Sequence, residues 1–126
     1  MSDMVDPTDF EAFCPLFRHA VELIGRRWSG AIIRTMLGGA TRFSEICATV
    51  PGLSDRLLSE RLKELDFEGV LVRTVYPETP VRIEYRLTAK GESLAPVIEA
   101  ISSWAETWMR DGAAAEPVVN RRSSRG

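Results

Sequence analysis

The segment PGLSDRLLSERLKELDFEG, residues 51–69, decides the fold of this chain. It opens with Pro51-Gly52, a dipeptide that marks a turn. Ser54 follows as a candidate helix N-cap, and Gly69 supplies a stop signal at the other end. Leucines recur between them at the spacing of one buried helix face, at Leu57, Leu58, Leu62 and Leu65. These features predict an amphipathic helix that begins directly after a tight turn.

The residues before this helix predict three more helices. The first covers 15–25 and is opened by a proline, and the second covers about 27–37. After a short extended piece, Thr41-Arg42-Phe43, Ser44 is the candidate N-cap of a third helix at about 44–49. A short helix, a tight turn and a capped second helix together predict a helix-turn-helix.

The residues after it change to the alternating pattern of strands. Residues 71–75 and 81–87 predict two strands joined by a proline-rich tip. The second strand places Val81, Ile83, Tyr85 and Leu87 on an inner face, and Arg82, Glu84 and Arg86 on an outer one. Thr88 then caps a last helix to about Met109, in which Pro96 either makes a kink or marks the true first turn. The fold is predicted to be mainly α with a small β-hairpin (α+β), a winged helix-turn-helix with extra helices at both ends.

Composition and charge limit the class of protein. The chain has 126 residues, of which 44% are hydrophobic and 27% charged, with a formal net charge of −2. We expect a disordered acidic leader (1–13), one domain (14–110) and a disordered basic tail (111–126). The absence of a long apolar run and of a secretory signal predicts no membrane association and a cytoplasmic location. The net charge is unusual for a nucleic-acid-binding domain, so any basic face must come from local arrangement.

The polar face of the helix after the Pro-Gly turn carries the candidate DNA contacts. At about 100° per residue, one stripe of this helix lies opposite the leucines, and the N-terminal end is the part that enters the major groove deepest. The residues predicted to contact DNA are Ser54, Asp55, Arg56, Ser59, Glu60 and Lys63. Arg61 falls on the apolar side, so we expect it to be structural, with its head paired to a carboxylate. A plain surface helix would show the same pattern, but the attached turn and hairpin favour DNA contact.

Three arginines outside this helix are further candidates. Arg82 and Arg86, on the outer face of the hairpin, are placed for phosphate or minor-groove contact. Arg42, before the third helix, is the third candidate. The alternative for the hairpin arginines is pairing with Glu84 or Glu78, and for Arg86 both interpretations stay open.

Several short motifs recur in an order that resembles one family. They are Cys14-Pro15, Gly25-Arg26-Arg27-Trp28, Arg42-Phe43-Ser44-Glu45-Ile46, Pro51-Gly52-Leu53-Ser54, Leu58-Ser59-Glu60-Arg61-Leu62 and Glu84-Tyr85-Arg86-Leu87-Thr88. Over residues 14–108 the chain resembles the HxlR-type transcriptional regulators of the MarR-like winged helix superfamily. The resemblance implies a homodimer built from the terminal helices and an inverted-repeat operator in double-stranded DNA. Arg26 stands where a second glycine is common in the family.

Dimerisation also has support from the residues themselves. The last helix ends its apolar stripe in two tryptophans, and the first helix adds a second apolar stripe, more than so small a domain can bury. The candidate dimer interface is Leu16, Phe17, Val21, Ile101, Trp104 and Trp108. The alternative is that the two tryptophans cover the core of the monomer.

Cys14 is the candidate redox or electrophile sensor. Its place before Pro15 predicts an N-cap position, where the helix dipole and Arg18 would raise its reactivity. The resemblance adds that several family members sense quinones, aldehydes or oxidants through a cysteine in this context. A small buried residue at the dimer interface is an equal alternative. Cys47 is expected to fill the core, with an intersubunit Cys14–Cys47 disulfide as a minor alternative.

Other classes of function have less support. The alternative function is a regulator that binds a small aromatic effector between its helices, near Trp28, Phe17 and Trp104, with Cys14 only structural. The sequence has no Ser-His-Asp set, P-loop or Gly-rich dinucleotide motif, so no enzyme and no cofactor are predicted. The single His19 and the two cysteines lack a metal-ligand spacing.

Overall fold

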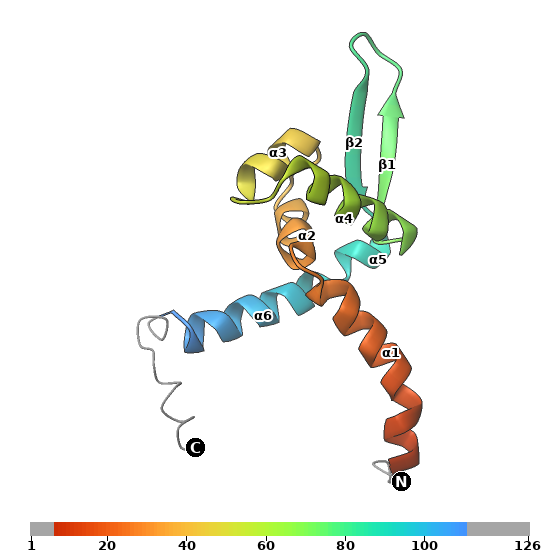
Figure 1. The fold of residues 1–126 in the computed structure, drawn as a ribbon, viewed down its shortest axis with the longest axis vertical. Helices are drawn as coiled ribbons and strands as arrows, with labels where there is room; N and C mark the ends of the chain where they lie inside the picture. The colour runs from red at the N-terminus through yellow and green to blue at the C-terminus, as the bar shows by residue number, and fades with distance from the viewer. Residues whose placement is uncertain (1–6, 111–126) are drawn as a thin grey trace.

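A three-helix body carries a hairpin on one side and two long helices on the other. The computed structural model describes residues 7–110 as α1 (Pro7–Gly25), α2 (Ser29–Leu37), α3 (Phe43–Thr49), α4 (Asp55–Phe67), β1 (Leu71–Tyr76), β2 (Arg82–Leu87), α5 (Ala89–Glu92) and α6 (Ala95–Trp108). Figure 1 shows α2, α3 and α4 in the body, the hairpin above them, and α1 and α6 extending below. The predicted winged helix-turn-helix, mainly helical with a two-stranded antiparallel hairpin, is confirmed.

The core lies where α2 meets α3, α4 and the base of the hairpin. Helix α2 contacts α1, α3, α6 and β2, and its Ile32 and Ile33 are fully buried. The remaining buried apolar residues are Met36, Ile46, Val50, Leu53, Leu58, Leu62, Leu65, Val70, Leu71 and Ile98. The burial of these apolar side chains is the main contribution to the free energy of folding of the helix-turn-helix.

Helix α4 has nearly the bounds that its sequence predicts. Leu53 and Leu58 are both buried on either side of the Ser54 cap, which is the arrangement of a hydrophobic staple. At the other end, Gly69 has a φ of +79°, the left-handed conformation with which helices commonly stop.

Helix α1 begins much earlier than predicted. It starts at Pro7, and Pro15 lies inside it, so the prediction that Pro15 opens this helix is wrong. Pro15 has no N–H to donate to the preceding turn, a local loss that this helix tolerates. The predicted leader is therefore helical from Pro7 onward, while residues 1–6 and the predicted tail, 111–126, lie outside the described residues.

The joint between α1 and α2 is tightly constrained. Trp28 has a φ of +78°, the one positive value for a non-glycine residue in the described part of the chain, so α2 starts at Ser29 rather than near residue 27. Two contacts link α1 and the residue that follows it to the C-terminal end of α4 and its cap. Nε2 of His19 lies 3.0 Å from Oε1 of Glu68, and Nε of Arg26 lies 3.1 Å from Oε1 of Glu64.

The hairpin leads into two helices instead of one. Strands β1 and β2 pair in antiparallel register from Leu71 opposite Leu87 to Tyr76 opposite Arg82. Oγ1 of Thr88 accepts a hydrogen bond from the N–H of Gly91 at 3.1 Å, which confirms the predicted cap, but α5 ends at Glu92. Pro96 lies in the first turn of α6, the second of the two predicted alternatives.

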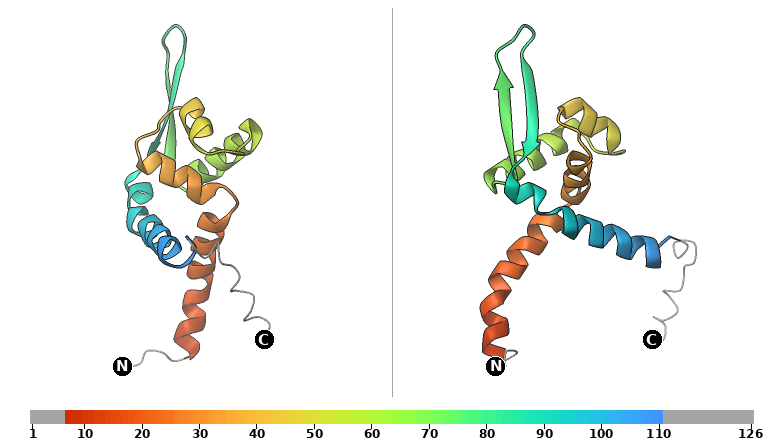
Figure 2. Two further views of the ribbon diagram at one scale, coloured as in Figure 1. Left: turned by 90° about the vertical axis from the view of Figure 1, so that its left-hand side faces the viewer. Right: turned by 180° about the vertical axis from the view of Figure 1, so that it is seen from behind.

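Helices α1 and α6 diverge from the body. Figure 2 shows, from a second side and from behind, that both leave the end of the body opposite the hairpin. Viewed from behind, they point to different sides. The fold therefore has two distinct ends, one formed by the hairpin with α3 and α4, the other by α1 and α6.

Candidate nucleic-acid interface

The turn between α3 and α4 is fixed at both ends. Gly52 has a φ of +87°, and a Cβ added there would lie 3.3 Å from Cη2 of Trp28. Oγ of Ser54 accepts a hydrogen bond from the N–H of Leu57 at 3.1 Å, which confirms Ser54 as the N-cap. Helix α4 therefore leaves the turn in one defined direction.

The exposed face of α4 holds most of the predicted DNA contacts. The Arg56 side chain is 88% exposed, and its Nε lies 3.4 Å from Oε2 of Glu60. Lys63 is exposed and Ser59 is half-buried. An exposed pair one helical turn apart contributes little stability, so Arg56 can exchange Glu60 for another anion or a base edge at small cost.

The two predicted contacts at the start of α4 already have partners in the chain. Ser54 caps the helix, and Oδ1 of Asp55 lies 3.2 Å from the Cys47 thiol, to which it acts as acceptor. This hydrogen bond, with burial and the charge of Asp55, raises the pKa of the Cys47 thiol. Cys47 also packs against the core, as predicted. Nothing in the sequence signals the Asp55–Cys47 contact, because it depends on the geometry of the turn between them.

Arg61 is an interior residue, although it lies on the same helix as Arg56. It is 8% exposed, and its Nε donates to the backbone carbonyl of Arg27 at 2.9 Å. Its Nη1 lies 3.4 Å from Oε2 of Glu64. The predicted structural role, with the head paired to a carboxylate, is confirmed.

The start of α3 presents Arg42 to solvent. Oε1 of Glu45 accepts hydrogen bonds from the N–H groups of Thr41 and Arg42, at 2.9 and 3.0 Å. These two bonds lower the pKa of Glu45. The prediction of Ser44 as N-cap is wrong, because α3 begins one residue earlier and Arg42 takes that position. The Arg42 side chain is exposed at the N-terminus of α3, so it is accessible to a ligand.

The hairpin arginines are held by two glutamates. Nη2 and Nε of Arg86 lie 2.6 and 2.9 Å from Oε1 of Glu84, and Nη1 of Arg82 contacts the other oxygen of Glu84. Arg82 also donates from Nη2 to Oε2 of Glu78 at 2.9 Å, and its guanidinium lies 3.8 Å from the ring centroid of Tyr76. Pairing with Glu84 and Glu78, one of the two predicted alternatives, is therefore what this structure contains.

Glu84 itself departs from prediction. It is 6% exposed, so the expectation that it lies on a solvent-facing strand surface is wrong. The hairpin projects beyond the body, and Ile83 and Tyr85 on its other face are half-buried. The paired arginines cover Glu84, and their hydrogen bonds, from Arg86 first and also from Arg82, lower its pKa.

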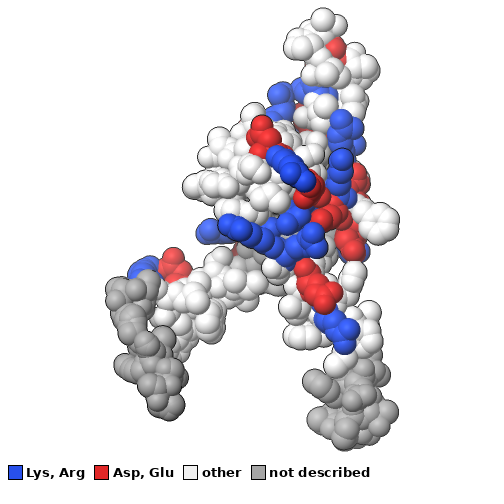
Figure 3. Space-filling model, in the orientation of Figure 1, with Lys and Arg blue, Asp and Glu red and all other residues white. Residues whose placement is uncertain are grey.

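Charge on the exposed surface is mixed. On the face shown in Figure 3, Lys and Arg side chains extend from the helical body up along the hairpin, and acidic side chains lie among them. On this face α6 is mostly uncharged up to its far end, whereas the part of α1 that is not grey shows both basic and acidic side chains. A mixed surface of this kind gives modest non-specific attraction to a polyanion, so specific contacts must supply more of the affinity.

Large apolar side chains cover the outer surfaces of α1 and α6. Leu16 and Phe17 are each 71% exposed, and the other predicted interface residues Val21, Ile101, Trp104 and Trp108 are also exposed. The alternative that the tryptophans cover the monomer core is wrong. Exposed apolar side chains in this number are typical of a surface that associates with another molecule.

The candidate sensor and effector sites fall partly on these helices. Cys14 is half-buried in the interior of α1, so the predicted N-cap position is wrong, and with it the argument from the helix dipole. Trp28 packs against the core, whereas Phe17 and Trp104 are exposed on diverging helices. One chain does not bring the three aromatic residues together, so the aromatic effector site stays a prediction.

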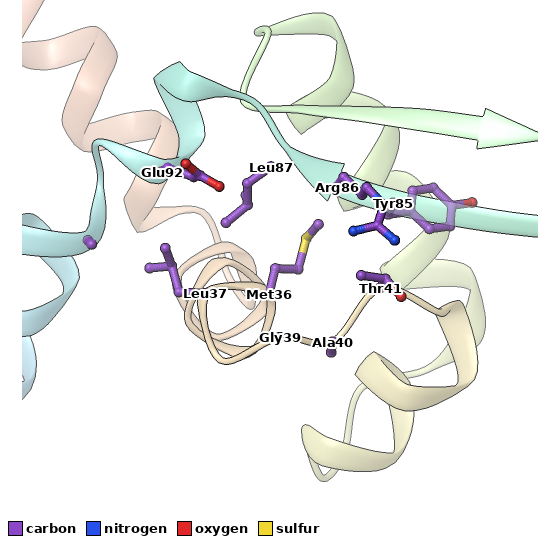
Figure 4. Close-up of a pocket in the computed structure, with 10 residues that line it drawn as sticks. Met36, Leu37, Gly39, Ala40, Thr41, Tyr85, Arg86, Leu87 and Glu92 are labelled. Carbon is purple, nitrogen blue, oxygen red and sulfur yellow. The ribbon is translucent and has the colours of Figure 1, made fainter.

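A pocket of about 500 Å³ lies between the end of α2, β2 and the start of α6. Figure 4 shows Met36 and Leu37 on its α2 side, Arg86 and Tyr85 at one end and Glu92 at the other.

Within residues 7–110, no three His, Cys, Asp or Glu side chains are placed to hold a metal ion. None of the helices in that range is long and apolar enough to cross a membrane.

Known relatives share both the sequence and this fold. YvaP of Bacillus subtilis strain 168, an uncharacterized HTH-type transcriptional regulator, is 56% identical over 96 residues, which are 76% of this chain and 89% of YvaP. The reduced form of the transcriptional regulator YodB from B. subtilis superposes with a TM-score of 0.69 at 42% identity, covering 79% of this chain and 97% of YodB.

A redox regulator adds a third likeness. HypR in its reduced form has a TM-score of 0.72 at 29% identity, covering 79% of this chain and 98% of HypR. The profile of the family described as HxlR-like helix-turn-helix matches residues 23–113. The chain thus belongs to the HxlR-like helix-turn-helix family and is a transcriptional regulator, not an enzyme.

Proposed function

We propose that this protein is a sequence-specific DNA-binding regulator that acts in the cytoplasm as a homodimer on an inverted-repeat operator. The supporting observation is the separation of two surfaces. A capped helix presents Arg56, Ser59 and Lys63 at one end of the molecule, and apolar helices are left uncovered at the other. In this proposal the N-terminal half of α4 enters the major groove, and the hairpin is the wing, which contacts the flanking backbone.

The homodimer follows from the surface of α1 and α6. Two such surfaces brought together would bury the exposed leucine, phenylalanine and tryptophan side chains of both copies, a strong driving force for association. A twofold axis between the copies places two α4 helices at equivalent positions. A symmetric protein of this kind is matched by a symmetric operator, with half-sites about one helical turn of DNA apart or a multiple of it.

Selection of bound duplexes from a random pool tests the DNA-binding proposal. The expected result is an enriched inverted repeat, bound by a particle of twice the 14.1 kDa chain mass. The variant Lys63→Ala is expected to weaken binding to all sequences and to reduce its salt dependence. Failure to enrich any sequence, or enrichment of a site without symmetry, would contradict the proposal.

We infer that the Cys14 thiol switches this regulator. Three observations support this second proposal: Cys14 is a half-buried free thiol, it lies on a helix of the proposed dimer interface, and relatives have been solved in redox-related states. YodB has been solved diamide-treated and quinone-bound, and HypR in oxidised and reduced forms. A modified thiol in an apolar interface would change how the two copies pack, and with them the spacing of the two α4 helices.

Thiol treatment of matched variants tests the switch. Diamide or a quinone is expected to change the operator affinity of the native protein and of Cys47→Ser, and to leave Cys14→Ser unaffected. Intact mass spectrometry identifies the modified residue. A Cys14→Ser protein that responds like the native one would contradict the switch while leaving the DNA-binding proposal standing.

A further inference from the structure

The wing contains a compact cluster of four charged side chains and one aromatic ring. Glu84 lies between Arg82 and Arg86, which occupy the strand positions two residues before and after it. Each arginine binds a different oxygen of the Glu84 carboxylate. Arg82 continues the chain of contacts to Glu78 and stacks on Tyr76.

The cluster has no net charge, and hydrogen bonds restrict the conformations of its arginine side chains. Two arginines face two glutamates, so these two arginines add little to the attraction that the wing exerts on distant phosphates, and the exposed Arg73 on β1 carries the remaining positive charge of the wing. Glu84 is the buried member, and it uses both oxygens, which fixes the two guanidinium groups relative to one another. The hydrogen bonds also keep the pKa of Glu84 below its ordinary value, so it remains a carboxylate at neutral pH.

The arginines nevertheless remain able to reach a ligand. The side chain of Arg86 is 56% exposed, and that of Arg82 is 29% exposed. Glu84 takes up Nε and Nη2 of Arg86, which leaves part of that guanidinium outside the contact. A preorganised arginine loses less side-chain entropy when it binds than a free one.

We propose that Glu84 is a positioning residue for DNA binding. It aims Arg82 and Arg86 and offsets their charge, so that these two arginines do not bind DNA irrespective of its sequence. This inference rests on the proposed function, because it takes the wing to be a DNA contact. Glu84 thereby sets the ratio of specific to non-specific affinity. Its effect passes through the arginines and requires no contact between Glu84 and DNA.

The test compares Glu84→Gln with Glu78→Gln, each of which removes one negative charge from the same cluster. Affinity is measured for the duplex selected from the random pool and for a scrambled duplex, between about 50 and 200 mM salt. One uncancelled charge per protomer steepens the slope of log K against log salt by about 0.9. For the two protomers of a dimer, this is a roughly tenfold larger loss of affinity between the lowest and the highest salt concentration. Both variants should show this steeper slope.

The two variants should differ in specificity. Glu78 contacts Arg82 near the tip and is 52% exposed, so Glu78→Gln leaves Glu84 in place between the arginines. Only Glu84→Gln is expected to weaken binding to the selected duplex while it strengthens binding to the scrambled one. The positioning role would be overturned if Glu84→Gln left the ratio of specific to non-specific affinity unchanged, or if both variants lowered this ratio equally.

Two further variants separate the possible failures. If Glu84→Gln does not fold, Glu84→Asp keeps the charge on a shorter stem; it should retain the native salt slope but lose specific affinity, and native values for both would overturn the inference. The double variant Arg82→Ala/Arg86→Ala tests the underlying proposal. If it binds the selected duplex as the native protein does, the wing is not a DNA contact and the proposed function fails in that part. If it binds weakly while Glu84→Gln changes nothing, the inference alone fails.

Discussion

Two arginines on α4 allow a paired test of which residues hold the fold and which act on DNA. Replacing Arg61 with alanine removes the 2.9 Å hydrogen bond to the Arg27 carbonyl and the packing of a side chain that is 8% exposed. A buried hydrogen bond from a charged group contributes about 1.5–3 kcal/mol, and the carbonyl would lose its partner. For a chain of this length each kcal/mol lowers Tm by about 3–5 °C, so Arg61→Ala should melt roughly 5–15 °C below the native protein.

Arg56→Ala should show the opposite pattern. Its side chain is 88% exposed, so its removal should change stability by less than about 0.5 kcal/mol. If Arg56 makes a bidentate contact to a base, its loss should weaken operator binding by about 1–3 kcal/mol, roughly fivefold to 150-fold in Kd.

The assays are thermal unfolding and fluorescence anisotropy with the selected operator, with both variants measured at one protein concentration and below their Tm. A native Tm for Arg61→Ala would refute its assignment to the interior. Native operator affinity for Arg56→Ala would refute the assignment of the α4 face to DNA.

Three further predictions concern single contacts. Asp55→Asn, in a background that lacks the other cysteine, should move the alkylation of Cys47 to lower pH, because the carboxylate that raises the pKa of this thiol is gone; an unchanged pH profile would contradict this. Glu45 has a folded pKa below its ordinary value of 4.5, so it stabilises the fold above that pH and the benefit is lost as acid protonates it. The Tm difference between the native protein and Glu45→Gln should therefore shrink from pH 7 to about pH 3; a constant difference would refute the role of the charge. A Cβ at Gly91 would clash with the backbone carbonyl oxygen of Val70, so Gly91→Ala should destabilise the fold by about 1–3 kcal/mol in denaturant unfolding, and a native midpoint would show that α5 is free to move.

Features set by a short stretch of chain could be predicted from the sequence. Helix α4 is an example, because its leucines, the Ser54 cap and the stop at Gly69 all act within one element. The interior position of Arg61 followed from the same helical geometry. Strand pairing in the wing was likewise signalled by alternation across a proline-rich tip.

Features that depend on neighbours outside one element could not be predicted. Alternation placed Glu84 in solvent, but β2 lies against the start of α3, where the N–H of Tyr85 donates to the Thr41 carbonyl at 2.8 Å, and the two arginines of its own strand also enclose Glu84. Pro15 was a start signal in isolation, yet the turns before it are helical and simply continue through it. The Asp55–Cys47 contact needed the path of the turn, which residue spacing does not give.

The joint at Trp28 determines the direction in which α1 leaves the body. Cys14 lies eleven residues before Gly25, so its arm is about 16 Å long at 1.5 Å per residue. A tilt of about 15° at the joint would displace the thiol by roughly 4 Å. Nε of Arg61 in α4 donates a hydrogen bond to the Arg27 carbonyl, directly before Trp28, so the joint is linked to α4. A tilt of α1 would therefore be opposed by this hydrogen bond as well as by Leu23 and Trp28, which pack against the core on either side of the joint.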